Sequence, residues 1–154
     1  MIGRTLCTEQ MVACASPDYL ACQGHLVEPA GLTAHQVLSY SHIPDGQLWL
    51  FEKDGKLTPA PVRSLLILNN GEAMRDFALA GLGLAMLPRF IVAASIVASE
   101  LEPVLPGCAT WKMPVLALWP PMPPMPPMPP MPAKLRALVD HLAQELVGGR
   151  PWTK

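Results

Sequence analysis

The chain has 154 residues, of which 51% are hydrophobic and 15% are charged, and its formal net charge is −1. This is enough apolar sequence for the core of one domain, or of one lobe plus part of another. The 11 basic residues are scattered along the chain and are offset by 12 acidic ones. Because Lys and Arg supply most of the non-specific affinity for phosphates, this balance predicts that the chain alone has no nucleic-acid-binding surface.

The cysteines and the N-terminus narrow the classes of protein further. Cys7, Cys14, Cys22 and Cys108 stand at no metal-binding spacing, so we expect neither a metal site nor a cofactor. A redox pair of Cys14 and Cys22 is conceivable, but buried or incidental thiols are the favoured interpretation. Residues 1–6 lack the basic start and apolar core of a signal peptide, which predicts a cytoplasmic location.

Residues 77–101 are almost entirely apolar and long enough to span a bilayer. Arg89 lies at the centre of this stretch, where a charge costs ~2.5 to 3.5 kcal/mol on insertion scales. Pro88 breaks a helix at the same point. We therefore expect this stretch to be part of a soluble core.

The first part of the chain predicts short, alternating elements. Ser16 offers a hydroxyl N-cap directly before Pro17, which suits the first position of a helix. Gly24 is typical of the residue that ends a helix. The expected elements are a buried strand at 11–15, a helix from Ser16 to Gly24, a weaker helical signal at 29–35, and a strand at 36–41.

A hairpin is expected next, because two strand-like runs flank an Asp-Gly pair. The runs are Leu48–Phe51 and Leu57–Val62, and the pair is Asp54 and Gly55. Prolines at positions 59 and 61 cannot donate to a ladder, so the second run should be an edge strand.

The following segment predicts a strand–helix–strand unit. An apolar strand at 65–68, expected to be buried, leads into Asn69, which fits an N-cap, and Glu72 three residues later completes the pattern of a capping box. Gly81 or Gly83 should end the helix, and residues 84–87 return to a sheet. Such a unit favours a parallel pair of strands with a right-handed crossover.

The remaining elements are a short helix at 90–99, strands at 101–105 and 113–119, and an amphipathic helix at 133–147. Between the last two lies the sequence WPPMPPMPPMPPMP, with four consecutive Pro-Pro-Met units, which should form an extended polyproline II rod. One interpretation is a docking peptide for an aromatic-lined groove. The favoured one is repeat expansion in the coding DNA.

The segment Asn69-Asn70-Gly71 is a candidate ligand site. It follows a strand and opens a helix, so it should lie where open α/β sheets bind ligands and where a helix N-terminus attracts anions. The structural alternative is that Asn69 only caps the helix and Gly71 only permits a turn. If Asn69 is the cap, its replacement by alanine should cost ~1 kcal/mol, and replacement of Asn70 should barely change stability.

Five segments carry a family resemblance: SPDYLACQG, YSHIPDGQLWLF, NNGEAMRDFALAGLGLAMLPRF, LEPVLPG and KLRALVDHLAQEL. In this order they resemble the effector-binding domain of LysR-type transcriptional regulators, over roughly Leu6 to Leu146. The resemblance implies an α/β fold like that of the type 2 periplasmic binding proteins. Two lobes would be joined by two crossing strands, with a small effector in the cleft between them.

The resemblance also implies a domain organisation in which the second lobe is essentially complete and the first is partial. The expected parts are a first-lobe remnant at 1–10, the second lobe at 11–112, a returning strand at 113–119, the Pro-Pro-Met tract at 120–132, a C-terminal first-lobe helix at 133–147, and a tail at 148–154. The DNA-reading winged helix-turn-helix of the family is not in this sequence. The chain therefore resembles a truncated regulator, a gene fragment or the product of an alternative start.

The function implied is effector sensing without catalysis, and DNA would be contacted only through the absent N-terminal domain. A full-length regulator would be a homo-oligomer. The effector would be a small carboxylate or another polar metabolite. The expected cleft residues are Ser16, Ser41, Asn69, Asn70 and Gly71.

Two other classes of protein remain as alternatives. A solute-binding protein of a transporter shares the implied fold, but the missing signal peptide argues against it. An enzyme is disfavoured because the four histidines are scattered and because Ser16, which precedes a proline, is better explained as a cap than as a nucleophile.

Overall fold

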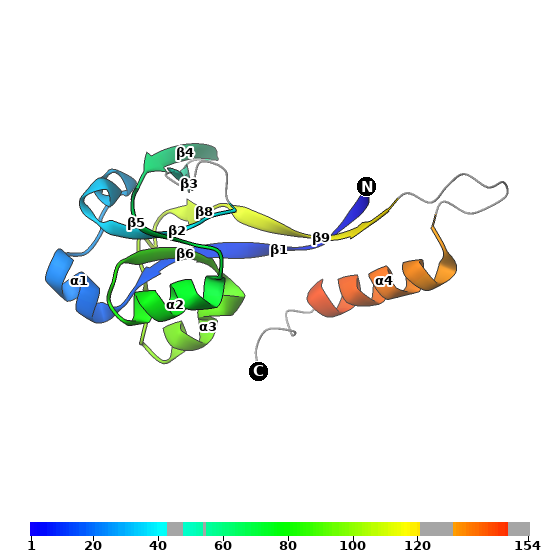
Figure 1. The fold of residues 1–154 in the computed structure, drawn as a ribbon. Helices are drawn as coiled ribbons and strands as arrows, with labels where there is room; N and C mark the ends of the chain where they lie inside the picture. Colours follow the sequence, from blue (N-terminus) through cyan, green and yellow to red (C-terminus); the bar gives the residue numbers. More distant parts are fainter. Residues whose placement is uncertain (43–47, 54, 121–130, 148–154) are drawn as a thin grey trace. The chain divides into compact units, whose positions relative to one another are not determined.

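A computed structural model describes residues 1–42, 48–53, 55–120 and 131–147. Within it the chain divides into two compact units (Figure 1). The large unit comprises residues 10–112, and the small unit comprises residues 1–9 together with those from 113 onward. Most of the Pro-Pro-Met tract, the 148–154 tail and Asp54 of the expected hairpin turn lie outside the described residues, so the polyproline interpretation stays a prediction.

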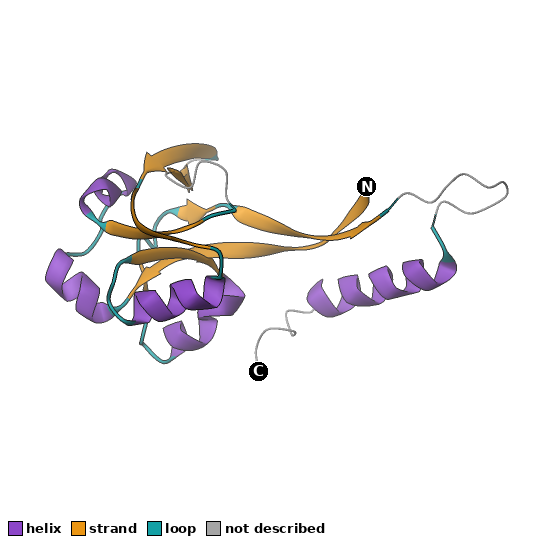
Figure 2. Cartoon of the chain, in the orientation of Figure 1, coloured by secondary structure: helices purple, strands orange, loops and turns teal. Residues whose placement is uncertain are grey.

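The large unit is built on a mixed sheet, shown in orange in Figure 2. Its strand β2, next to the edge, is parallel to β5 on one side and to β6 on the other. The next strand, β1, is antiparallel to β6 and to the short β7, and β9 also pairs with β1. In sheet order the strands are β5 (Arg63–Leu68), β2 (Gln36–Tyr40), β6 (Leu84–Pro88), β1 (Ile2–Ala15) and β7 (Glu102–Pro103).

A second, three-stranded sheet holds the predicted hairpin. β3 (Leu48–Lys53) lies between β4 (Lys56–Pro61) and β8 (Ala109–Thr110). The expectation that β4 is an edge strand is confirmed, because β4 is the end strand in the order of this sheet. β8 has only two residues, too few for periodicity to reveal it in the sequence.

The helices follow the predicted sequence signals closely. They are α1 (Pro17–Gln23), the 3₁₀ helix η1 (Pro29–Ala34), α2 (Gly71–Leu79), α3 (Arg89–Val97) and α4 (Ala133–Val147). The predicted cap of α1 is confirmed: the Tyr19 N–H donates to Ser16 Oγ at 3.3 Å, and Pro17 occupies the first turn. Gly24 ends α1 with a φ of +89°, a conformation that favours glycine.

One hydrophobic cluster of the large unit lies between the mixed sheet and the pair α2 and α3, which contact each other and the sheet (Figure 1). α2 contributes Met74 and Ala78, and α3 contributes Val92. The residues of this cluster are Cys14, Leu38, Met74, Ala78, Ala85, Leu87, Val92 and Leu101, all at most 2% exposed. Burial of this apolar surface is the main stabilising term of the unit.

Two expectations about the strand–helix–strand unit are wrong. β5 is not a buried strand: Leu65, Leu66 and Ile67 are 44%, 37% and 66% exposed. The reason is that β5 is an edge strand, covered by a neighbour on one side only. In addition, β5 and β6 are not paired with each other, because β2 lies between them and is parallel to both.

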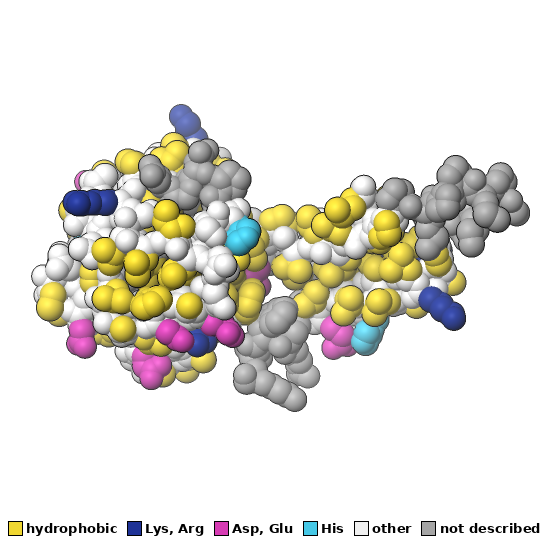
Figure 3. Space-filling model, in the orientation of Figure 1, with side chains coloured by type: hydrophobic (Ala, Val, Ile, Leu, Met, Phe, Trp, Pro, Cys, Tyr) yellow, Lys and Arg dark blue, Asp and Glu magenta, His cyan; other side chains and the backbone are white. Residues whose placement is uncertain are grey.

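The small unit contains β9 (Lys112–Trp119) from Met113 onward, the first nine residues of the chain and α4. Arg4 and Asp140 form an ion pair between β1 and α4, and Val139 of α4 is buried. Hydrophobic side chains cover much of its drawn face (Figure 3). Four leucines are markedly exposed: Leu116, Leu118, Leu138 and Leu142.

The apolar stretch 77–101 folds as the end of α2, then β6, then α3. Within the ranges that the structure describes, no helix combines the length and the apolar character that a bilayer crossing requires.

A buried histidine makes the stability of the large unit depend on pH. The Gln36 N–H donates to Tyr19 Oη at 3.0 Å, and this hydroxyl lies 3.3 Å from His35 Nδ1. This geometry suits a neutral His35 whose Nδ1 accepts a hydrogen bond from the Tyr19 hydroxyl. Burial lowers the pKa of His35 below its ordinary value of 6.5.

The unfolded chain therefore binds a proton at His35 at a higher pH than the folded chain does. We expect the free energy of unfolding to fall as the pH drops below 6.5, until the lower folded-state pKa is reached. Urea titrations at about pH 8 and about pH 5.5 measure this loss. His35→Gln should reduce it, whereas the exposed His25→Gln should not, and an undiminished loss in His35→Gln would show that another group is responsible.

Candidate ligand-binding site

The carboxyl ends of three parallel strands meet at one edge of the mixed sheet. Tyr40 of β2 is paired with Leu68 of β5, and the Ser41 N–H donates to the Leu68 carbonyl at 2.8 Å. Leu38 is paired with Ala85 of β6, so Ser41 is level with Pro88. Open α/β sheets bind ligands beyond this end of their strands. We call it the ligand edge, formed by residues 41–42, 69–71 and 88–90.

The structure does not place Ser16 at the ligand edge. β1 runs antiparallel to β6, with Met11 opposite Pro88, so the chain enters the large unit near the ligand edge and reaches Ser16 at the far one. There the Ser16 side chain is 4% exposed and caps α1. Gly81, beyond the C-terminus of α2, lies close to it. The other four expected site residues, Ser41, Asn69, Asn70 and Gly71, are brought together.

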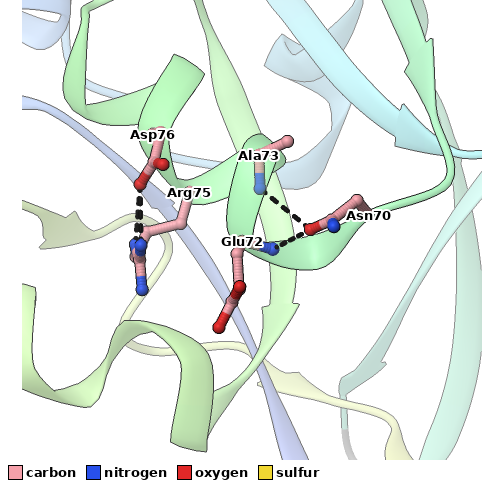
Figure 4. Close-up of polar contacts among 5 residues, drawn as sticks. All are labelled: Asn70, Glu72, Ala73, Arg75 and Asp76. Carbon is pink, nitrogen blue, oxygen red and sulfur yellow. Dashed lines mark hydrogen bonds and ion pairs between the residues drawn. The ribbon is translucent and has the colours of Figure 1, made fainter.

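The expectation that Asn69 caps α2 is wrong, because Asn70 is the cap (Figure 4). Asn70 has an extended backbone, and its Oδ1 accepts from the Glu72 N–H at 2.8 Å and from the Ala73 N–H at 3.1 Å. The helix begins at Gly71, so Ala73 stands where a capping box requires Glu or Gln. The sequence offered two adjacent asparagines, and spacing alone favoured the wrong one.

Gly71 has a packing role. A Cβ at this position would lie 2.7 Å from Ile91 Cδ1 and 3.6 Å from Leu87 Cδ2, because the start of α2 packs tightly against α3 and β6. Asn70 already satisfies two of the N–H groups at the start of α2, and Glu72 places a carboxylate in its first turn. The N-terminus of α2 is therefore a weaker anion site than the sequence suggests.

With Asn70 as the cap, the expected effects of the two alanine substitutions on stability are the reverse of those predicted from the sequence. Asn70→Ala should lower the free energy of unfolding by ~1 kcal/mol through the lost side-chain cap. Asn69→Ala should change it by less than ~0.5 kcal/mol, since Asn69 is exposed and does not cap the helix. Urea denaturation of both variants measures the difference, and equal losses would contradict the assignment of Asn70 as the sole cap.

Sequence reasoning missed two polar residues of the ligand edge. His42 follows Ser41, with its Nδ1 3.1 Å from Ser41 Oγ and its ring centroid 5.3 Å from that of Tyr40. Arg89 directly follows β6 and is the first residue of α3. The sequence indicates that both residues follow the ends of strands. It does not indicate the order of the strands in the sheet, and this order brings the two strand ends together.

Arg89 is the cation best placed to meet an anionic ligand. It is exposed and forms none of the ion pairs found among the described residues, whereas Arg75 is held by Asp76 at 2.8 Å (Figure 4). No side chain caps α3, whose residue preceding the helix is Pro88. A cation at a helix N-terminus opposes the helix dipole, so Arg89 is placed unfavourably for stability but favourably for binding a carboxylate.

The four cysteines are free thiols. Burial raises the pKa of the Cys14 thiol to about 12, so it remains protonated at neutral pH. Cys22, the other member of the conceivable redox pair, is exposed. In the part of the chain that the structure describes, no group of three or more His, Cys, Asp and Glu side chains is arranged to hold a metal ion.

The family of the chain is clear from comparison with known proteins. The family model of the LysR substrate binding domain matches residues 1–147. The chain therefore belongs to the family of LysR substrate-binding domains. The periplasmic-binding-protein-like α/β fold expected from the sequence is confirmed by its structural neighbours.

Among curated relatives, the HTH-type transcriptional regulator PtxR of Pseudomonas aeruginosa is 31% identical over 144 residues, which are 92% of this chain and 43% of that protein. The HTH-type transcriptional activator AaeR of Escherichia coli is 32% identical over 119 residues, 77% of this chain and 38% of that protein. The chain thus spans less than half the length of these relatives.

Among solved structures, the regulatory domain of CrgA, a LysR-type transcriptional regulator from Neisseria meningitidis, is similar with a TM-score of 0.74 and 25% identity. The match covers 94% of this chain and 68% of that one. The full-length Vibrio cholerae virulence activator AphB has the same fold, with a TM-score of 0.74, 18% identity, and 94% and 47% of the two chains covered.

Proposed function

We propose that the domain senses a small carboxylate, or another polar metabolite, that binds at the ligand edge. The observation that carries this proposal is the convergence of Ser41, His42, Asn69 and Arg89 at the carboxyl ends of three parallel strands. Arg89 would pair with the carboxylate, and the hydroxyl and amide side chains would bind the remaining polar groups.

The same proposal assigns the two units of the chain to the two lobes of the family's fold. Residues 10–112 would correspond to the second lobe, and residues 1–9 with 113–147 to part of the first. Ser16 would then stabilise α1 and not contact the effector, and Gly71 would shape the edge through packing. We further propose that the domain has no catalytic activity and works in the cytoplasm. The regulator would be a homo-oligomer that contacts DNA through a separate N-terminal domain.

A ligand screen tests the proposed function. The regulator that contains this domain would be melted in the presence of small mono- and dicarboxylates and of matched neutral amides. A ligand at 100 times its Kd stabilises a folded protein by ~2.7 kcal/mol, which raises the melting temperature measurably. We expect stabilisation by at least one carboxylate and not by its amide. Stabilisation by neutral ligands alone would contradict the assignment of an anion site.

A further inference from the structure

His42 lies at the ligand edge, level with the residues that follow the strands on both sides of β2. β2 and β6 are parallel, with Leu38 opposite Ala85, so this register brings His42 level with Arg89. The pairing of β2 with β5 brings it level with Asn70 in the same way. Neighbouring strands of a sheet lie about 4.8 Å apart, so a carboxylate paired with Arg89 is within reach of the His42 side chain.

The imidazole of His42 contacts its neighbour through one nitrogen and is open to solvent. Its Nδ1 lies 3.1 Å from Ser41 Oγ, and its ring centroid lies 5.3 Å from that of Tyr40. His42 is exposed, and it forms none of the ion pairs found among the described residues. Because Nδ1 interacts with Ser41, Nε2 is the nitrogen that remains for a ligand, and it donates a hydrogen bond whenever the imidazole is protonated.

Charged side chains of α2 and α3 lie near the same edge as His42. The titratable and charged side chains of the surrounding elements are Tyr40 of β2, Glu72, Arg75 and Asp76 of α2, and Arg89 of α3. Arg75 and Asp76 pair with each other at 2.8 Å, and β5 is followed by two neutral asparagines. Asp45 of the next loop lies outside the described residues. An anion bound beside Arg89 places a negative charge next to His42, which favours the protonated over the neutral imidazole.

We propose that binding of a carboxylate at the ligand edge is coupled to protonation of His42, so that the carboxylate binds more tightly as the pH falls. The inference rests on the proposed function, because it needs a carboxylate beside Arg89. Histidine is the side chain whose charge ordinarily changes between about pH 5 and 8. Protonated His42 would donate a charge-assisted hydrogen bond from Nε2 to the carboxylate, and the proton is taken from solvent. By linkage, the carboxylate then strengthens proton binding by the same factor.

Calorimetric titration of the regulator that contains this domain measures the coupling directly. The heat of proton uptake depends on the buffer, so titrations in MES and in Bis-Tris at one pH give the number of protons taken up on binding. The probes are acetate, pyruvate and benzoate, whose carboxyl groups stay ionised above about pH 6, and any carboxylate that stabilises the regulator in the melting screen. We expect uptake of a fraction of a proton at about pH 6.5. Binding should be about three- to fivefold tighter at about pH 6 than at about pH 8, because an exposed ion pair contributes modestly.

Two variants make the test specific. His42→Gln keeps a polar side chain that cannot be protonated, so it should still bind the carboxylate but without proton uptake and with nearly equal affinity at the two pH values. His25→Gln is the matched control, because His25 is also exposed but lies between α1 and η1, and its uptake should be unchanged. Binding without proton uptake, or uptake that persists in His42→Gln, would overturn the inference and leave the proposed function intact. Failure of every carboxylate to bind would contradict the proposed function itself, and the inference with it.

Discussion

Gly83→Ala should lower the free energy of unfolding by about 3 kcal/mol, at the upper end of the cost of overpacking. Gly83 is buried and directly precedes β6, where Leu84 pairs with Val37 of β2. An added Cβ would lie 2.6 Å from the Gln36 carbonyl oxygen and 3.1 Å from the carbonyl carbon. These are backbone atoms of β2, so neither can rotate away as the end of a side chain would.

Urea denaturation measures this loss, and Gly107→Ala is the control. Gly107 is exposed, and a Cβ there would meet no atom within 4 Å, so its replacement should be nearly neutral. A loss below about 1 kcal/mol would mean that the two strands approach each other less closely than described.

Arg89→Ala should weaken binding of a carboxylate effector by about 10- to 100-fold. A hydrogen bond to a charged group contributes ~1.5 to 3 kcal/mol, and 1.4 kcal/mol corresponds to a factor of ten in affinity. Stability should be unchanged or slightly raised, because the variant removes a cation from the N-terminus of α3. Loss of affinity with retained stability separates a binding role from a structural one.

Calorimetric titration of the regulator with the carboxylate identified by melting measures this effect. Arg63→Ala is the matched control: Arg63 is also exposed, but it begins β5 and lies at the opposite edge of the mixed sheet. Arg89→Lys keeps the charge and should lose less affinity than alanine. An unchanged Kd for Arg89→Ala, or an equal loss for Arg63→Ala, would exclude Arg89 from the site.

The local signals of the sequence were sufficient for most elements. Ser16 and Pro17 define the start of α1, the Pro residues of β4 define an edge strand, and the apolar spacing of residues 133–147 defines α4. In each case the determining chemistry lies within a few residues along the chain: a hydroxyl cap, a missing N–H or a helical period.

The arrangement of the elements in the sheet was harder to predict from the sequence. The run 65–68 is as apolar as a buried strand, yet it lies at the edge of the sheet, because its neighbours are decided by pairing and not by its composition. Ser16 and Ser41 each follow a strand, and the sequence does not show at which edge of the sheet each strand ends. Only the antiparallel direction of β1 shows that these strands end at opposite edges.

Amide exchange of the regulator, with and without a carboxylate that stabilises it, is the most direct test that the ligand edge is the effector site. We expect added protection in residues 41–42, 69–72 and 89–91, where the backbone lies at the carboxyl ends of β5, β2 and β6. We expect no specific protection around Ser16 and Tyr19 at the opposite edge. Protection confined to Ser16 and its surroundings, with none at residues 41–42, 69–72 or 89–91, would contradict it.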